Sequence, residues 1–233
     1  MNLLVAVSLG IIALTGALVA QGAPPATFMV PATREPHHDV KLDNRYVRVL
    51  DVTVPPYDST LIHIHENPYV YVSIGAATLK AQVLGSNEFT DLILKDGEVR
   101  YSPVVTHRVG NIGATPFRNI TIQIQGKDDT PPTDTSAASA ARANGSSAVL
   151  DNELIHVERL MLAPGQSTGS HGHARSNLLV AVHDGSVQVT TDGRPPVRVA
   201  MKAGDFDWHT GARTHAIVNA GTTPFEAIEV EWK

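Results

Sequence analysis

Two copies of one histidine pattern constrain this chain more than any other feature. His63-Ile64-His65 is followed by His107, and His171-Gly172-His173 is followed by His215. The differences in residue number between counterparts are identical, since 171 − 63, 173 − 65 and 215 − 107 all give 108. A fixed offset of this kind is the signature of an internal duplication. We therefore expect two similar folding units, each carrying three histidines.

Residues around the histidines keep the same register. At the same offset, Asp43-Asn44 matches Asp151-Asn152, Pro56 matches Pro164, Asn111 matches Asn219, and Pro116-Phe117 matches Pro224-Phe225. Between the copies, residues 127–150 are rich in Pro, Ser, Thr and Ala, a composition typical of linkers. The sequence therefore predicts a first domain at residues 26–126, a linker at 127–150 and a second domain at 151–233.

Short alternating segments predict strands throughout both copies. YVRVLDVTV from Tyr46, TLIHIH and YVYVSI are rich in β-branched and aromatic residues, and Gly, Asp or Pro separates them. Side chains two residues apart on a strand point to the same side, so His63 and His65 face one space. Even spacing of short strands favours an all-β barrel or sandwich in each copy.

The composition excludes several classes of function. The net charge is −5 and no cluster of Lys and Arg is present, which argues against a nucleic-acid partner. The absence of cysteine excludes disulfides, thiolate catalysis and Cys-bound metals. Any metal must therefore be bound by His, carboxylate, amide or phenol groups.

The N-terminal segment has the character of a targeting signal. Residues 3–20 are apolar throughout, which suits a secretory signal peptide or a short membrane anchor, although no Lys or Arg precedes them. We expect residues 1–25 to be this hydrophobic segment, with cleavage near Gln21. The mature protein is then expected to be secreted or periplasmic, without stable membrane association.

The histidines predict two metal sites. Two imidazoles from one strand and a third from a distant strand form a three-nitrogen face, so we expect His63, His65 and His107 to bind one metal, and His171, His173 and His215 another. Neutral imidazole binds Fe, Mn, Ni, Zn and Cu, which leaves the identity of the divalent transition metal open. Three protein ligands leave positions for water or substrate, as in catalytic sites. Pairs of surface histidines without a metal are the alternative. The adjacent His37-His38 could bind a metal as well, but we expect this pair to be solvated.

At this point the chain resembles the cupin superfamily, and its duplication resembles a bicupin. The second copy carries Pro164-Gly165, His171, His173, Gly185, Gly204-Asp205, His215, Asn219 and Gly221 at the spacing of the two cupin motifs. The first carries Pro56, His63, His65, Gly75, Asp96-Gly97, Pro103, His107, Asn111 and Gly113. The resemblance implies two jelly-roll-like β-barrels in tandem and a small-molecule substrate, and it leaves a homo-oligomer open.

Both copies depart from the family at its glutamate ligand. Tyr69 stands four residues after His65, and Asn177 four residues after His173. Without that carboxylate the resemblance implies neutral three-histidine sites. It then favours dioxygenases and lyases over cupins that require three histidines and a glutamate, such as oxalate decarboxylases. Asn177 could lend an amide oxygen, and Tyr69 could act as acid, base or weak ligand, or simply pack.

The functional expectation is a metal-dependent enzyme acting on a small oxygen-containing molecule, either an oxidoreductase of the dioxygenase type or a lyase. A non-catalytic module that binds a sugar or an acid is the alternative. We expect the second copy to bind metal more tightly, because its motif residues match the family better and Asn177 is smaller than Tyr69. Trp208 and His209 are interpreted as rim residues of the second barrel.

Overall fold

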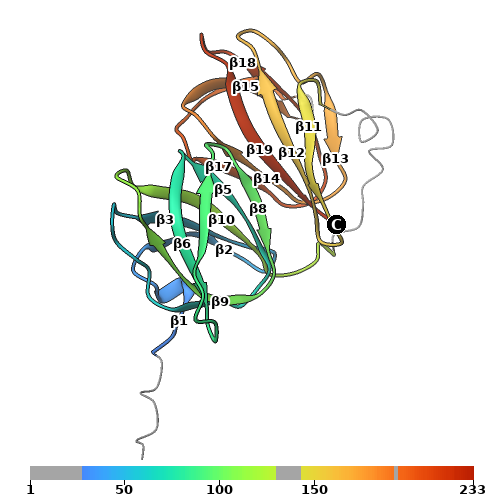
Figure 1. The fold of residues 1–233 in the computed structure, drawn as a ribbon. Coiled ribbons are helices and arrows are strands. Elements are labelled where there is room, and N and C mark those ends of the chain that lie inside the picture. The colour runs from blue at the N-terminus through green and yellow to red at the C-terminus, as the bar shows by residue number, and fades with distance from the viewer. Residues whose placement is uncertain (1–27, 130–142, 192–193) are drawn as a thin grey trace, which may run out of the picture.

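The computed structural model describes residues 28–129, 143–191 and 194–233, which form two β-barrels (Figure 1). Apart from one short 3-10 helix, η1 (Ala32–Arg34), the described elements are strands, which confirms the all-β prediction. In this part of the chain no helix is long and apolar enough to cross a membrane. The predicted signal segment and residues 130–142 of the predicted linker lie outside the described residues.

The first barrel is built from two five-stranded sheets. One has the order β1 (Val30–Pro31), β4 (His63–His65), β9 (Val105–Asn111), β6 (Ala77–Val83) and β7 (Thr90–Leu94). The other has the order β2 (His38–Asp43), β3 (Val47–Val54), β10 (Phe117–Ile124), β5 (Tyr69–Ile74) and β8 (Val99–Ser102).

The second barrel repeats this arrangement. One sheet has the order β11 (Ser146–Asp151), β12 (Ile155–Leu162), β19 (Phe225–Trp232), β14 (Asn177–Ala181) and β17 (Phe206–His209). The other has the order β13 (His171–His173), β18 (Arg213–Asn219), β15 (Gly185–Thr191) and β16 (Val197–Met201). His63 lies opposite His107 and His171 opposite His215, so the offset of the duplication holds in the strand pairing as well.

The linker is shorter than the sequence suggested. Residues 146–151 form β11, which pairs with β12, although they fall inside or beside the range predicted as linker. At the N-terminal end of the predicted linker, the buried carboxylate of Asp128 accepts a hydrogen bond from the backbone N–H of Ser176 over 2.5 Å. This residue is therefore packed against the second barrel. Small Ser and Ala residues gave this edge strand the composition of a linker, so the domain boundary predicted at residue 151 is too late.

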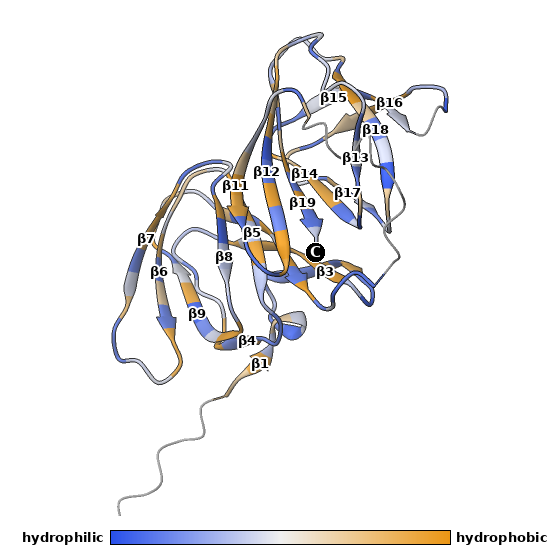
Figure 2. Ribbon diagram, turned by 90° about the vertical axis from the view of Figure 1, so that its right-hand side faces the viewer, coloured by the Kyte–Doolittle hydropathy of each residue, from blue (hydrophilic) through white to orange (hydrophobic). Residues whose placement is uncertain are grey.

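The largest hydrophobic core lies between the barrels rather than inside either one. Strands β10 and β19 are the central strands of two facing sheets, and their even-numbered residues point across the interface. Figure 2 shows apolar stretches on β12 and β14 of the same layer. Fifteen buried residues from both barrels form this core, including Ile120, Ile122, Ile228, Val230 and Trp232. Since this burial needs both barrels, neither is expected to be stable alone.

Two arginines, each in an ion pair within its own barrel, also donate a hydrogen bond to the other barrel. Arg118 binds both carboxylate oxygens of Asp51 over 2.9 and 2.8 Å, and its third nitrogen donates to a backbone carbonyl of the second barrel. At the equivalent positions of the second copy, Arg159 pairs with Glu226 and donates to a backbone carbonyl of the first barrel. The acid and the base have exchanged positions between the copies, so each barrel supplies one arginine to the other.

The repeated asparagines have a structural role. Asn219 donates through Nδ2 to the carbonyls of Leu162 (2.9 Å) and Thr223 (2.8 Å), and its Oδ1 accepts from Gly221 (2.9 Å). Asn111 makes the equivalent bonds in the first barrel. Each side chain is buried, and it joins the end of one strand to a turn that follows another. The asparagine of the second cupin motif is therefore a structural connection and not a ligand.

We expect Asn219→Ala to lower the free energy of unfolding by about 2–4 kcal/mol, because three buried backbone groups lose their partner together. Urea unfolding followed by circular dichroism measures the change. The exposed Asn87 provides a matched control, since Asn87→Ala removes the same atoms from the surface. A loss as small as that of the control would contradict the structural role.

Candidate metal centres

Three histidine nitrogens converge inside the second barrel. Strand β13 directs His171 and His173 inward, and the adjacent β18 brings His215 opposite His171. The Nε2 atom of His215 lies 2.9 Å from that of His171 and 3.1 Å from that of His173. Two nitrogens bound to one ion at ~2.0–2.1 Å, at angles between 90° and tetrahedral, lie about 2.8–3.4 Å apart. The three predicted ligands are therefore at the spacing that a shared ion requires.

A fourth donor comes from β19, where the sequence did not predict one. Glu229 Oε1 lies 3.0 Å from His173 Nε2 and 3.8 Å from His215 Nε2. The donor atoms of the three histidines and Glu229 all lie within 4.8 Å of one another, and all four residues are buried. The expectation of a neutral three-histidine site is thus wrong for the second barrel, because a carboxylate reaches it from another strand.

The sequence contains a signal that could have identified Glu229. The last strand, FEAIEVEW, alternates, and Phe225, Ala227, Glu229 and Glu231 share its inward side. A glutamate is uncommon on the buried face of a strand, where a charge needs a partner. The equivalent positions of the first copy carry Thr121 and Gln123, so only the second copy has inward carboxylates on this strand.

Several polar atoms of this site lack hydrogen-bond partners within the described residues. His215 Nδ1 is buried and has no hydrogen-bond partner in this part of the chain, and the buried Glu229 Oε1 contacts His173 Nε2 as an ion pair without the geometry of a hydrogen bond. Three Nε2 atoms also face one another, and a neutral imidazole has one ring proton to share. A bound cation would satisfy the three nitrogens and the carboxylate together, so the donor set fits a divalent metal.

Charge in this site is concentrated on one ion pair. Burial lowers the pKa of His173, but the carboxylates of Glu229 and Glu231 outweigh burial and raise that pKa to about 9. Burial raises the pKa of Glu229, but His173 outweighs burial and holds that pKa below its usual range. Burial lowers the pKa of His215 to about 2, and it also lowers that of His171. Without an ion, the site therefore holds a proton on His173 only.

Hydrogen bonds behind the site orient the rings. His171 donates through Nδ1 to the carbonyl of Gly169 over 3.2 Å, and His173 Nδ1 lies 3.3 Å from Glu231 Oε2. The other oxygen of Glu231 accepts from the backbone of Ala174 over 3.0 Å. A proton fixed on Nδ1 leaves the Nε2 lone pair for a metal, and a carboxylate partner increases the basicity of the ring.

The first barrel groups its histidines differently. The rings of His63, His65 and His107 pack together, with centroids 4.7 to 5.3 Å apart. The donor atoms that lie within 4.8 Å of one another belong, however, to His38, His63 and His65. The expectation that His38 is solvated is wrong: the residue is buried, and its Nδ1 contacts the carboxylate of Glu35 over 2.5 Å.

Neutral hydrogen bonds satisfy His63 and His65 of the first barrel, whereas the buried Nε2 of His107 has no hydrogen-bond partner among the described residues. Gln123 Nε2 donates to His65 Nδ1 over 3.0 Å, which leaves the proton of His65 on Nε2, 3.1 Å from His63 Nε2. His63 in turn donates from Nδ1 to the carbonyl of Leu61 over 2.9 Å. Burial lowers the pKa of His63 to about 4 and that of His65 to about 2, so both rings stay neutral. The position that matches Glu229 is occupied by Thr121.

Tyr69 and Asn177, the predicted catalytic candidates, occupy equivalent inward positions. Tyr69 is buried and stacks on His65, with ring centroids 4.3 Å apart. Burial raises the pKa of its phenol, which therefore stays protonated at neutral pH. Asn177 is fully buried, and its Oδ1 has no hydrogen-bond partner among the described residues. Tyr69 therefore packs against His65, and the catalytic role expected for Tyr69 and Asn177 stays a prediction.

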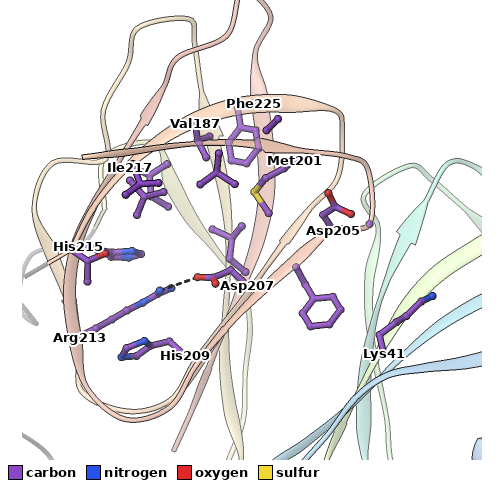
Figure 3. Close-up of a pocket in the computed structure, with 18 of the residues that line it drawn as sticks. Lys41, Val187, Met201, Asp205, Asp207, His209, Arg213, His215, Ile217 and Phe225 are labelled. Atoms are coloured by element: carbon purple, nitrogen blue, oxygen red, sulfur yellow. Dashed lines mark hydrogen bonds and ion pairs between the residues drawn. The ribbon is translucent and has the colours of Figure 1, made fainter. Parts of the chain in front are cut away.

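The two barrels differ in the space beside their histidines. A cavity of about 780 Å³ in the second barrel reaches His215, and Figure 3 shows Arg213 and His209 beside it with Val187, Met201 and Phe225 on the opposite wall. The cavity of the first barrel measures about 240 Å³. His209 lines the larger cavity as expected, but Trp208 packs into the core between the barrels.

Comparison with known proteins agrees with this architecture. Residues 158–231 match the cupin domain family. AerE from Microcystis aeruginosa superposes with a TM-score of 0.56 at 8% identity, covering 85% of this chain and 98% of that one. A variant of oxalate decarboxylase from Bacillus subtilis superposes with a TM-score of 0.55 at 13% identity, covering 81% of this chain and 69% of that one. No curated protein matches the sequence.

This chain contains a cupin domain, which the family match places at residues 158–231. It carries two cupin barrels in tandem, as the neighbouring bicupin structures do, so the expected resemblance is confirmed. At these identities the neighbours show the fold alone. Their activities are not transferred by the likeness, and the function must be argued from the residues of the two barrels.

Proposed function

We propose that this bicupin is a metal-dependent enzyme whose active centre lies in the second barrel. His171, His173, His215 and Glu229 would hold a divalent transition metal there. The observation that carries the proposal is the position of Glu229, which adds a buried carboxylate to three inward histidines beside a large cavity. Glu229 Oε1 pairs with His173 Nε2 over 3.0 Å and also faces His215 Nε2 over 3.8 Å, so the buried carboxylate is directed at the nitrogens that would hold the metal.

The residues around the centre would bind the metal, orient its ligands and exclude water. A metal bound there would act as a Lewis acid on an oxygen of the substrate. Glu231 fixes the ring of His173, and Gly169 fixes that of His171 through its carbonyl. Leu179, Val187, Ile217 and Phe225 belong to the apolar core that walls the cavity, which would limit the access of water to the reacting group.

Two reaction classes fit this centre. One is an oxidation with O₂ of the dioxygenase type, and the other is a lyase reaction, decarboxylation included, which uses the same Lewis acidity. The sequence argued against decarboxylases because a carboxylate ligand was missing, and Glu229 removes that argument. Bacillus subtilis oxalate decarboxylase, described for its Mn(II) centres, has the same fold at 12% identity with a TM-score of 0.58. Oxygen uptake during turnover separates the two classes.

A non-catalytic role is favoured for the first barrel. His63 and His65 are joined by neutral hydrogen bonds, the cavity is smaller, and Thr121 replaces the carboxylate. In this proposal the first barrel either stabilises the second barrel through the shared core or binds a small molecule. Export to the periplasm or the medium belongs to the same proposal, on the strength of the apolar residues 3–20. N-terminal sequencing of the protein from its host tests the cleavage.

Replacing Glu229 by glutamine tests the proposed centre. The substitution keeps the shape of the side chain but removes its charge, so we expect the metal affinity to fall by roughly 10-fold or more, the scale typical of supporting groups in metal sites. Elemental analysis of folded, untagged protein after dialysis measures the bound metal. Glu153→Gln is the matched control, because Glu153 is exposed. Equal metal content in the two variants would refute the role of Glu229.

A further inference from the structure

We infer that the second barrel takes an amphiphilic carboxylate, with its acid group on Arg213 and an apolar body in the cavity. This inference rests on the proposed function, because it names the substrate class of the same centre. Two observations carry it: a buried arginine with an unused hydrogen-bonding edge, and a large apolar wall beside that arginine.

Arg213 lies on the inner face of β18, two residues before His215, and 6% of its surface is exposed. Its Nη1 donates to Asp207 Oδ2 over 3.0 Å, but its Nε has no hydrogen-bond partner among the described residues. Its Nη2 lies 3.9 Å from Glu229 Oε1, beyond hydrogen-bond distance. A buried donor without a partner costs free energy. The Nε and Nη2 edge therefore makes no hydrogen bond to the described residues, and a planar, bidentate acceptor such as a carboxylate would satisfy it.

The nearby carboxylates already have cationic partners. Glu229 and Glu231 flank His173, and Asp207 takes Nη1 of Arg213 (Figure 3). Three further cations line the cavity. Lys41 pairs with Asp39 and Arg118 with Asp51, both from the first barrel, and Arg194 of the second barrel is exposed. Among the described residues that line this cavity, Arg213 combines burial with a free hydrogen-bonding edge, so it is the anchor for an anion.

The wall of the cavity indicates what accompanies the acid group. Its inner surface is formed by aliphatic and aromatic side chains, namely Leu179, Val187, Val189, Met201, Ile217 and Phe225. A volume of about 780 Å³ lies in the range of pockets that enclose ligands the size of a drug molecule. A small diacid would leave most of this apolar surface in contact with water. Burial of a hydrocarbon body is favourable there.

The first barrel provides an internal comparison. Val105 occupies the position that matches Arg213, and Val99 the position that matches Asp207. The equivalent cavity is about 240 Å³, and Tyr69 and Tyr71 line it. The first barrel therefore lacks both the buried cation and the large cavity. The two features occur together in the second barrel, which also holds Glu229.

Calorimetric titration of the metal-loaded full chain tests the inference with three probes of matched chemistry. 3-Phenylpropionate has the acid and the apolar body, 3-phenylpropanol lacks the charge, and acetate lacks the body. We expect 3-phenylpropionate to bind about 10-fold tighter than either of the others, since a charge-assisted bidentate contact and apolar burial each contribute on that scale. Equal binding of the acid and the alcohol by the wild type would overturn the inference.

Two variants, each with a matched control in the first barrel, test which residues contact the acid group and the apolar body. Arg213→Gln should abolish the preference for the acid over the alcohol, whereas Arg100→Gln, at the cavity of the first barrel, should keep it. Val189→Phe should weaken 3-phenylpropionate by filling the cavity, and Ala81→Phe, at the equivalent position of the first barrel, should not. A preference that survives in Arg213→Gln would also overturn the inference. If Arg213→Gln does not fold, the inference is tested by Val189→Phe and by the comparison of the three probes on the wild-type protein.

Metal content measured on the same samples separates this inference from the proposed function. A wild-type protein that does not retain metal contradicts the metal-dependent centre. A wild-type protein that is loaded with metal but shows no preference for the acid contradicts only the substrate class.

Discussion

Replacing His173 by alanine is expected to remove more bound metal than replacing His65 by alanine. His173 contacts two carboxylates, Glu229 within the site and Glu231 behind the ring. His65 instead accepts a hydrogen bond from Gln123 and stacks on Tyr69. In the first arrangement the two carboxylates stabilise a positive charge at His173, which a metal ion supplies when it displaces the Nε2 proton. In the second arrangement no carboxylate favours a charge on His65, whose Nε2 proton is shared with His63.

The expected magnitude is a loss of at least about 10–100-fold in metal affinity for His173→Ala, since supporting groups alone contribute on that scale. For His65→Ala we expect a change within about threefold, which is within the ordinary spread of such contributions. Elemental analysis and competition with a chelator, both on folded protein, measure the two losses. Equal loss in the two variants, or a greater loss in His65→Ala, would show that the first barrel is at least as good a site.

The second large effect concerns the core between the barrels. We expect the full chain to unfold in one cooperative transition, and Ile120→Ala and Ile228→Ala each to lower the free energy of that transition by about 2–5 kcal/mol. The two isoleucines occupy equivalent positions, both are almost fully buried, and both belong to the core shared by the barrels. A cavity at either position therefore weakens both barrels together.

Differential scanning calorimetry measures the number of transitions and their shifts. Ile93→Ala is the control of matched chemistry, because 73% of Ile93 is exposed, and we expect its effect to stay within about 0.5 kcal/mol. Two separate transitions, with Ile120→Ala shifting one and Ile228→Ala the other, would show that the barrels are independent and that the shared core contributes little.

The prediction of His171, His173 and His215 as one cluster shows what local pattern provides. Alternation places His171 and His173 on one face of a strand, and the duplicated spacing indicates that His215 comes from a repeated partner strand. The structure places His215 directly opposite His171. The same reasoning identified His63 and His65, but it could not detect that His38 from an edge strand enters the group.

Glu229 and Arg213 show why the rest of the site could not be derived from the sequence. Glu229 is far from His173 along the chain, and its carboxylate reaches the histidines only because β19 lies in the sheet that faces them across the barrel. No local period connects strands that distant in sequence. Arg213 is on the same strand as His215, but an arginine in a strand is usually at the surface, and only the packing shows that it is buried.

The sequence by itself determined the duplication, the all-β class and the inward histidines, because strand period and repeat offset are properties of the chain. Only the tertiary structure decided which barrel is equipped for a metal and a ligand. Thr121 and Gln123 in one copy and Glu229 and Glu231 in the other occupy the same places on equivalent strands. Their chemistry depends on which groups the opposite sheet brings within a few ångströms, and that distance is set by the closure of the barrel and not by the chain.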